Sequence, residues 1–277
     1  MLRVSNIDIS RPGDPGTKNI IGLGDCLLIA ACAQEYYKKF NKKLNYSTSP
    51  LLYDIFRESP YFNLNEKYVK PDLIIKWYAD VNKTGLSKLH TIQRFSLQLG
   101  FYIDPTAVVD IYLEGKHVLN VPTKKYVCIN ALANERNRRY IPERYVNFIA
   151  DYVKSKGYEV IWTGDNYTKD TIKDIKTCTT LYRDCTLFIG PVSFQYHLAG
   201  ALRTPSLLFC SYMPYYKFSH FINTDHIYST RSCVYRCEET CDDNDRQLRR
   251  ENNCLDQCKA VDYDEAEIAF KLNKLLK

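Results

Sequence analysis

The sequence predicts an α/β protein with two lobes, and three observations lead to this prediction. Apolar runs of strand length alternate with amphipathic segments of helix length along the chain, which is the pattern of parallel βαβ units. The periodic pattern lapses over residues 114–125 and restarts sharply at Tyr126. The 277 residues also suffice for two domains of about 100 to 150 residues each. We expect a first lobe at 1–118, a second at 119–262 and a C-terminal helix at 263–277.

Composition places the chain among ordinary folded proteins. Hydrophobic residues make up 45% and charged residues 25%, so the composition argues against disorder. No apolar run approaches the roughly 18 to 20 residues of a membrane span, and Met1–Ser10 lacks the pattern of a signal peptide. We therefore expect a cytoplasmic protein without a membrane span. The net charge of +6 is spread along the chain and allows an anionic partner without requiring one.

In the first lobe, an apolar strand over 19–25 is expected to turn through glycines into a helix from Cys26 to Phe40. The later elements are assigned from apolar runs bounded by turn residues and from apolar residues at helical spacing. They are a strand at 44–47, a helix at 50–57, a strand at 72–78, a helix at 90–99 and an apolar alternation at 107–113.

The second lobe repeats the alternation from Tyr126 onward. Its expected elements are a strand at 126–130, a helix at 143–156, a strand at 159–163, a short helix, a strand at 186–189, a helix at 194–202 and a strand at 206–210. The last helix, 263–276, is expected to bury an apolar face formed by Ala266, Phe270, Leu272 and Leu275.

The strongest motif is the segment 189–209, where a strand ends in a turn, a helix of small residues follows, and a Thr-Pro pair leads to the next strand. Unpaired amides and the helix dipole at such a helix N-terminus suit a diphosphate, and we place Ser193 and Gln195 there. His197 either packs inside the helix or contacts a phosphate or the acceptor. The segment resembles glycosyltransferase family 9, the heptosyltransferase-like enzymes, although Val192 and Phe194 replace the usual Asp and Gly.

This resemblance implies the GT-B architecture, in which two Rossmann-like lobes face each other across a cleft. It also implies a nucleoside-diphosphate sugar as donor, with no metal or other cofactor required. In the family, the motif matched by Gly22, Gly24 and Asp25 carries the proposed general base, so Asp25 is the candidate catalytic residue. Its alternative role is that of a helix N-cap, which is common for Asp at such turns.

A third match covers residues 126–145 and places two further residues at the donor site. Asn130 ends the strand, and Arg139 stands where the family has Lys, so that its guanidinium would neutralise the leaving diphosphate. Arg136 and Arg138 are either part of this cation cluster or solvent-facing loop charges. Two weaker matches lie at 90–100 and at 162–165, and the second of these adds Gly164 and Asp165 to the expected nucleotide-sugar-binding residues.

Eleven cysteines are many for a cytoplasmic enzyme, and five of them fall within the segment 233–258. Gaps of three residues place successive sulfurs on one helical face. Cys237, Cys241, Cys254 and Cys258 therefore fit two helices bridged by disulfides or, less typically, a Zn²⁺ site. We favour disulfides, with Cys233 left over. The other six lie in apolar contexts and are expected in the core: Cys26, Cys32, Cys128, Cys178, Cys185 and Cys210.

The sequence thus predicts transfer of a sugar to an acceptor hydroxyl, with a bacterial glycan such as lipopolysaccharide as the acceptor that the resemblance favours. A second hypothesis is a phage-type enzyme that glycosylates hydroxymethylated DNA in an infected host, suggested by the basic balance and the cluster Arg136 to Arg139. A third hypothesis is a GT-B scaffold that binds a nucleotide sugar or a glycan without catalysis. The replacement of the usual Asp and Gly by Val192 and Phe194 supports it.

Overall fold

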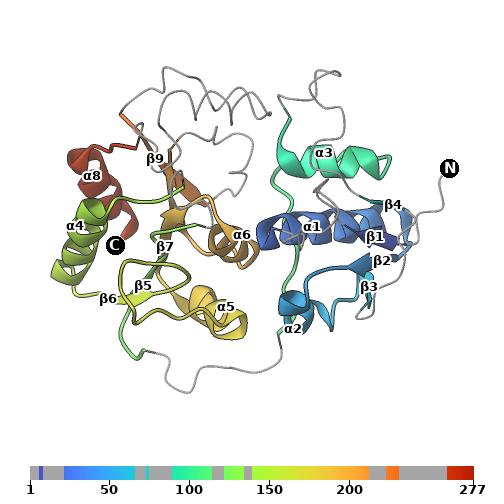
Figure 1. The fold of residues 1–277 in the computed structure, drawn as a ribbon, viewed down its shortest axis with the longest axis horizontal. Coiled ribbons are helices and arrows are strands. Elements are labelled where there is room, and N and C mark those ends of the chain that lie inside the picture. Colours follow the sequence, from blue (N-terminus) through green and yellow to red (C-terminus); the bar gives the residue numbers. More distant parts are fainter. Residues whose placement is uncertain are drawn as a thin grey trace, which may run out of the picture. The chain divides into compact units, whose positions relative to one another are not determined.

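The computed structural model describes residues 6–8, 22–65, 73–74, 89–113, 122–133, 139–211, 223–230 and 261–277, with the side chains of 6–8 and 73–74 left out. The chain divides into two compact units, Met1–Gly115 and Lys116–Lys277. Each unit contains a parallel sheet and covering helices (Figure 1). The predicted α/β class is therefore confirmed.

Unit 1 contains a four-stranded parallel sheet in the order β3-β2-β1-β4. The strands are β1 (Asn6–Asp8), β2 (Leu44–Ser47), β3 (Phe62–Asn65) and β4 (Leu73–Ile74). Two short helices, η1 (Pro50–Leu52) and α2 (Tyr53–Phe56), divide the predicted helix 50–57. The strand β3 was not predicted, because Asn63 and Asn65 interrupt its apolar pattern.

Helix α1 (Leu23–Phe40) is the centre of unit 1. All nine residues from Cys26 to Gln34 are buried, as expected for a helix that is apolar all round. It packs against β2, β3 and α3 (Thr91–Gln98).

The predicted alternation at 107–113 does not form a strand. Instead, the buried amide of Gln34 holds this backbone, since its Nε2 donates to Val108 O over 3.1 Å and its Oε1 accepts from Asp110 N over 2.8 Å. The apolar alternation thus reflects packing of an extended segment against α1, with Val109 buried.

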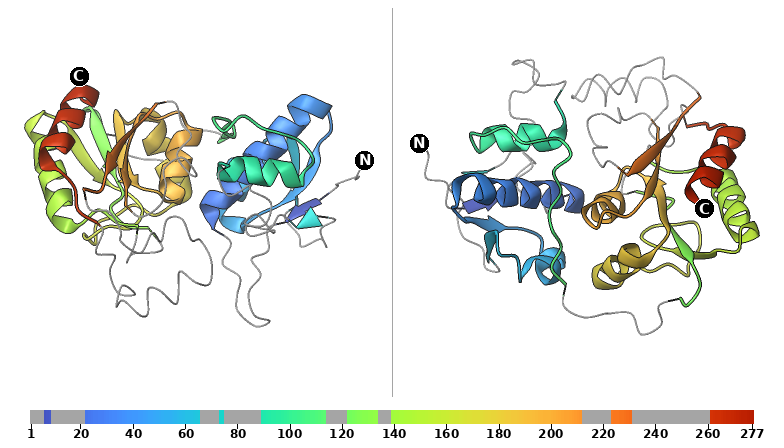
Figure 2. Two further views of the ribbon diagram at one scale, coloured as in Figure 1. Left: turned by 90° about the horizontal axis from the view of Figure 1, so that it is seen from above. Right: turned by 180° about the vertical axis from the view of Figure 1, so that it is seen from behind.

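Unit 2 contains a five-stranded parallel sheet in the order β6-β5-β7-β8-β9. Figure 2 shows helices on both of its faces, with α4 and α8 on one side and α5 and α6 on the other. Strands β5, β7 and β8 are buried at every residue, as in parallel sheets covered on both faces. The strands are β5 (Tyr126–Ile129), β6 (Glu159–Trp162), β7 (Leu187–Pro191), β8 (Ser206–Cys210) and β9 (Thr224–Tyr228). The helices are α4 (Glu143–Ser155), α5 (Ile175–Asp184), α6 (Phe194–Ala201) and α8 (Glu265–Leu275).

The apolar face predicted for the last helix is confirmed for Leu272, which is buried, and for Leu275, which packs against the core, and is wrong for the other two residues. Ala266 and Phe270 are exposed, Phe270 by 71%, whereas Ile268, Leu272 and Leu276 are buried. These three residues follow one another at intervals of four and join the core beside α4 and β9. The predicted set mixed two faces of the helix.

None of the described helices combines the length and apolar character that a membrane crossing needs.

Candidate functional site

The strand order of unit 2 reverses between β5 and β7, and ligands of doubly wound sheets bind outside the carboxyl ends of the strands at such a point. Asn130 follows β5, and Ser193 follows β7 two residues after Pro191. Their side chains meet, because Asn130 Nδ2 donates to Ser193 Oγ over 3.1 Å. Two residues that the sequence suggested separately therefore lie together at the switch point.

Helix α6 begins at the switch point, so the amides of its first turn lie there. Ser193 is its N-cap, and Ser193 Oγ accepts from the backbone N–H of Tyr196 over 3.3 Å. Gln195 lies in the first turn, where its Oε1 is 2.9 Å from the hydroxyl of Tyr182. The same hydroxyl lies 2.8 Å from Thr163 Oγ1 and so connects α6 to the end of β6. The amides of the first turn and the helix dipole favour an anion here.

Arg139 provides a cation at the same turn. Its Nη1 donates to Val192 O over 3.4 Å, directly before the N-cap of α6. The side chain is partly buried. Arg136 and Arg138 lie outside the described residues. The structure thus brings Arg139 to the helix terminus that the sequence suggested for a diphosphate.

His197 lies within α6 and is 6% exposed. Its ring centroid is 5.4 Å from that of Tyr196. This burial agrees more closely with the helix-packing interpretation of His197 than with direct contact to a bound phosphate or acceptor.

Gly164 lies where the loop after β6 passes the switch point. Its φ is +65°, and a Cβ at this position would lie 2.4 Å from Asn130 Oδ1 and 2.8 Å from Gln195 Cγ. Only glycine fits this backbone and this approach. The next residue, Asp165, donates its backbone N–H to Asn130 Oδ1 over 3.0 Å.

Asn130 is therefore engaged at both ends of its side-chain amide. It is 1% exposed, with Ser193 at its nitrogen and the Asp165 amide at its oxygen. This geometry suits a residue that positions the loops around a ligand.

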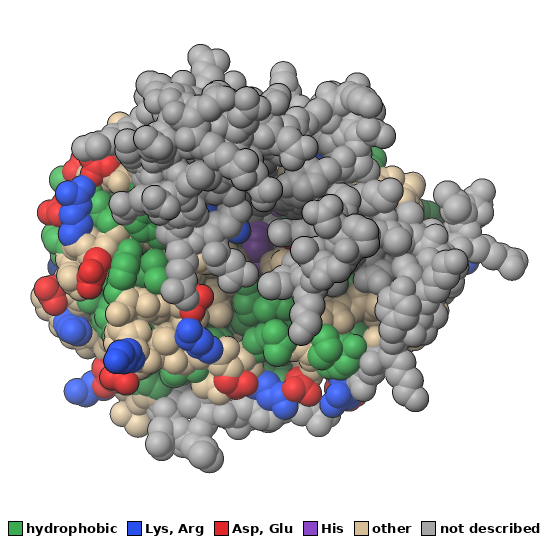
Figure 3. Space-filling view, viewed as in Figure 1, with side chains coloured by type: hydrophobic (Ala, Val, Ile, Leu, Met, Phe, Trp, Pro, Cys, Tyr) green, Lys and Arg blue, Asp and Glu red, His purple; other side chains and the backbone are tan. Residues whose placement is uncertain are grey.

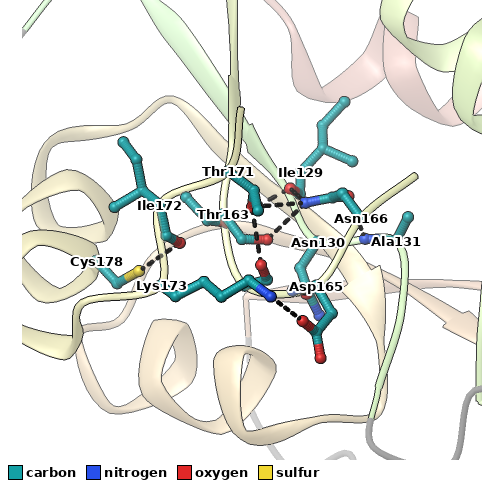
Figure 4. A network of polar contacts seen from close by, with 11 residues as sticks. Ile129, Asn130, Ala131, Thr163, Asp165, Asn166, Thr171, Ile172, Lys173 and Cys178 are labelled. Carbon is teal, nitrogen blue, oxygen red and sulfur yellow. Dashed lines mark hydrogen bonds and ion pairs between the residues drawn. The ribbon is translucent and has the colours of Figure 1, made fainter. Parts of the chain in front are cut away.

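Asn166, which the sequence did not suggest, holds the same loops together (Figure 4). Its Oδ1 accepts from Ala131 N over 2.7 Å, and its Nδ2 donates to Thr163 O over 2.7 Å and to Ile129 O over 3.1 Å. Lys173 Nζ lies 2.6 Å from Asp165 Oδ1 at the exposed edge of the loop. The signal in the sequence was only an Asn in a polar loop, and two of its partners, Ile129 and Ala131, lie at the end of another strand.

In unit 1, Gly22, Gly24 and Asp25 lie at the start of α1. The N-cap is Gly22, with no side-chain capping bond, and Asp25 is the third residue of the helix. The N-cap interpretation of Asp25 is therefore wrong, because the helix begins three residues earlier than predicted. A carboxylate in the first turn is still stabilised by the helix dipole. Asp25 is partly exposed.

The six cysteines expected in the core are all buried, free thiols. Burial raises the pKa of Cys26 to about 11 and the pKa of Cys178 and Cys210 to about 12, so they remain protonated near neutral pH. Among the described residues, no group of three or more His, Cys, Asp or Glu side chains could hold a metal ion. Cys233, Cys237, Cys241, Cys254 and Cys258 lie outside the described residues.

Known structures show which fold this is. TibC, an iron-containing dodecameric glycosyltransferase from enterotoxigenic E. coli, matches with a TM-score of 0.67 at 19% identity, over 99% of this chain and 77% of that chain. A glycosyl transferase family 9 protein from Veillonella parvula matches with a TM-score of 0.67 at 12% identity, over 99% of this chain and 97% of that chain. The chain shares the GT-B fold of these glycosyltransferases.

The E. coli ADP-heptose lipopolysaccharide heptosyltransferase II shares this GT-B fold, with a TM-score of 0.59 at 11% identity over 90% of this chain and 97% of that chain. A second structure of TibC is a complex with ADP-D-β-D-heptose. No protein-family model and no curated protein matches the sequence significantly. The likeness is thus one of fold.

Proposed function

We propose that this GT-B protein is a glycosyltransferase that moves a sugar from a nucleoside-diphosphate donor to an acceptor hydroxyl, with the donor bound at the carboxyl edge of the unit 2 sheet. The observation that carries the proposal is the meeting of Asn130, Ser193 and Arg139 at the switch point. A helix N-terminus beside a guanidinium is suited to a diphosphate.

The proposed chemistry is a displacement at the anomeric carbon of the donor sugar. The acceptor oxygen forms the new glycosidic bond, the bond to the diphosphate oxygen breaks, and the proton of the acceptor passes to Asp25 of unit 1. Arg139 and the amides of α6 stabilise the charge that grows on the leaving diphosphate. Gly22, Gly24, Gly164, Asp165, Gln195 and His197 shape the surroundings, and a single displacement of this kind inverts the configuration.

We propose an ADP-linked sugar as the first donor to test, because structures with the same fold contain ADP-D-β-D-heptose or ADP-2-deoxy-2-fluoro heptose. A glycan such as lipopolysaccharide remains the preferred acceptor class. On the face that Figure 3 shows, basic and acidic side chains of the described residues are interspersed. Hydroxymethylated DNA is the second acceptor class, and its binding should weaken steeply with salt.

The test is the release of nucleoside diphosphate from ADP- and UDP-sugars with and without candidate acceptors. Asp25→Asn should slow acceptor-dependent turnover by about 100-fold or more, the usual contribution of a general base, and leave donor binding unchanged. Asp54→Asn is the matched control, since Asp54 lies in α2 of the same unit and pairs with Arg57 at an exposed site. If Asp25→Asn turned over within a few-fold of the unaltered protein, the assignment of Asp25 as the general base would be wrong. Donor binding without any turnover would support the non-catalytic scaffold.

A further inference from the structure

Tyr167 is a large side chain that stays exposed at the carboxyl edge of unit 2. It is 41% exposed, although its hydroxyl donates a hydrogen bond of 2.9 Å to Ile141 O. The side chain thus links the loop after β6 to the segment that precedes α4. Its ring is fixed at the tip and remains partly open to solvent.

The backbone that carries Tyr167 is also held in place. Leu132 forms antiparallel bridges with both Tyr140 and Asp165, so three short segments lie side by side at the ends of β5 and β6. Asn166 adds its bonds to Ala131 and Thr163 from the position next to Tyr167 (Figure 4). An aromatic ring that is already fixed in this way loses little conformational entropy when a ligand packs on it.

A short chain of contacts connects this ring to the expected diphosphate site. Tyr167 lies two residues after Asp165, whose N–H bonds Asn130, and Asn130 bonds Ser193 at the start of α6. In doubly wound nucleotide-binding units, the pyrophosphate lies at a helix N-terminus, and the ligand occupies the crevice outside the carboxyl ends of the strands at the switch point. The strand β6 is the second strand of unit 2 in the chain and pairs with β5 at the switch point.

We propose that Tyr167 is a binding residue of the donor site and that its ring forms a wall on which the nucleoside stacks. This inference rests on the proposed function and assigns the part of the donor that contacts the loop after β6. Burial raises the pKa of Tyr167 to about 12. The hydroxyl therefore remains a donor to Ile141 O throughout the neutral range, and the ring keeps its position.

The test compares three ligands and two variants by isothermal titration calorimetry. ADP and UDP carry a nucleoside, whereas inorganic pyrophosphate carries only the phosphates. Tyr167→Ala should bind the preferred nucleoside diphosphate about tenfold more weakly, the usual effect of losing one base–aromatic stack, and should bind pyrophosphate within about twofold of the unaltered protein. Tyr167→Phe keeps the ring and should bind both ligands within about threefold.

Each other outcome overturns the inference in a recognisable way. An equal loss of ADP and pyrophosphate binding in Tyr167→Ala would show that the ring only supports the loop. Unchanged ADP and UDP binding would show that the nucleoside does not contact it. If the unaltered protein bound neither ADP nor UDP, the proposed function itself would fail.

Discussion

The side chain of Asn130 donates to Ser193 Oγ over 3.1 Å and accepts from the backbone N–H of Asp165 over 3.0 Å. One buried amide thus fixes both the N-cap of α6 and the loop that begins at Gly164. The capping hydroxyl at the N-terminus of α6 is therefore held by a residue that directly follows the neighbouring strand β5.

Asn130→Asp tests this relationship, because a carboxylate has the same shape but cannot donate to Ser193. At pH 7.5 the variant should bind ADP at least about tenfold more weakly than the unaltered protein, since a charge near the diphosphate repels it. Burial should raise the pKa of the introduced carboxyl. At pH 5 the protonated acid can again donate, so the affinity ratio between variant and unaltered protein should move back toward one. A ratio that is the same at both pH values would contradict the positioning role.

Gly164→Ala should reduce stability and ligand binding together. The variant combines a positive φ, which costs about 1 to 3 kcal/mol for a residue with a Cβ, with a clash against Asn130 and Gln195. Gly157→Ala is the matched control, because Gly157 has a φ of +83° and nothing within 4 Å of the added atom. Urea unfolding should show a loss larger than in the control by about 1 kcal/mol or more. Equal losses of stability in the two variants would mean that the loop at Gly164 accommodates the added methyl group without cost.

Stability should fall at alkaline pH because of the buried thiols. Folding raises the pKa of Cys26, Cys178 and Cys210 from 9.0 to about 11, about 12 and about 12. The folded state therefore binds more protons than the unfolded state above pH 9. The contribution of these thiols to the free energy of unfolding is fully present below pH 9 and is lost as the pH rises through 11 to 12. Urea unfolding at pH 8, 9.5 and 11 measures this, and Cys178→Ala should flatten the decline. A constant free energy of unfolding across this range would contradict it.

The late cysteines should form disulfides in the purified protein. Mass spectrometry after alkylation, with and without prior reduction, should show Cys237 and Cys241 linked to Cys254 and Cys258. Metal analysis of the same sample tests the alternative. One bound metal per chain together with four free thiols would contradict the disulfides and indicate a thiolate metal site. Both zinc and iron need to be quantified.

The sequence predicted the elements that bury apolar side chains on both faces. Strand β8 was predicted with its observed bounds, Ser206–Cys210, and all five of its residues are buried. Strand β9 was missed because only Ile227 is buried among polar neighbours, so its pattern carries little apolar periodicity. The start of α1 was predicted three residues late, since Gly22 and Gly24 argue for a turn and the burial that stabilises the helix comes from tertiary packing.

The candidate site was predictable only in part for a related reason. Ser193 could be suggested because a helix start is visible as a local pattern, and Arg139 because the segment around it resembles glycosyltransferase family 9. Asn166 and Tyr167 could not, because their roles depend on Ala131 and Ile141, which are 35 and 26 residues away. Contacts between loops at the ends of different strands leave no periodic signal in the chain.

The measurement that tests the central claim most directly is a thermal-shift panel of nucleoside diphosphates and nucleotide sugars on the unaltered protein, Arg139→Ala and Arg183→Ala. Arg183 is the matched control, since it is exposed in the last turn of α5, which leads to the amino end of β7. A ligand at 100 times its Kd adds about 2.7 kcal/mol of stability. We predict a clear shift with one nucleotide family in the unaltered protein and in Arg183→Ala, and a much smaller shift in Arg139→Ala. No shift with any nucleotide, or equal shifts in all three proteins, would contradict a diphosphate site at the start of α6.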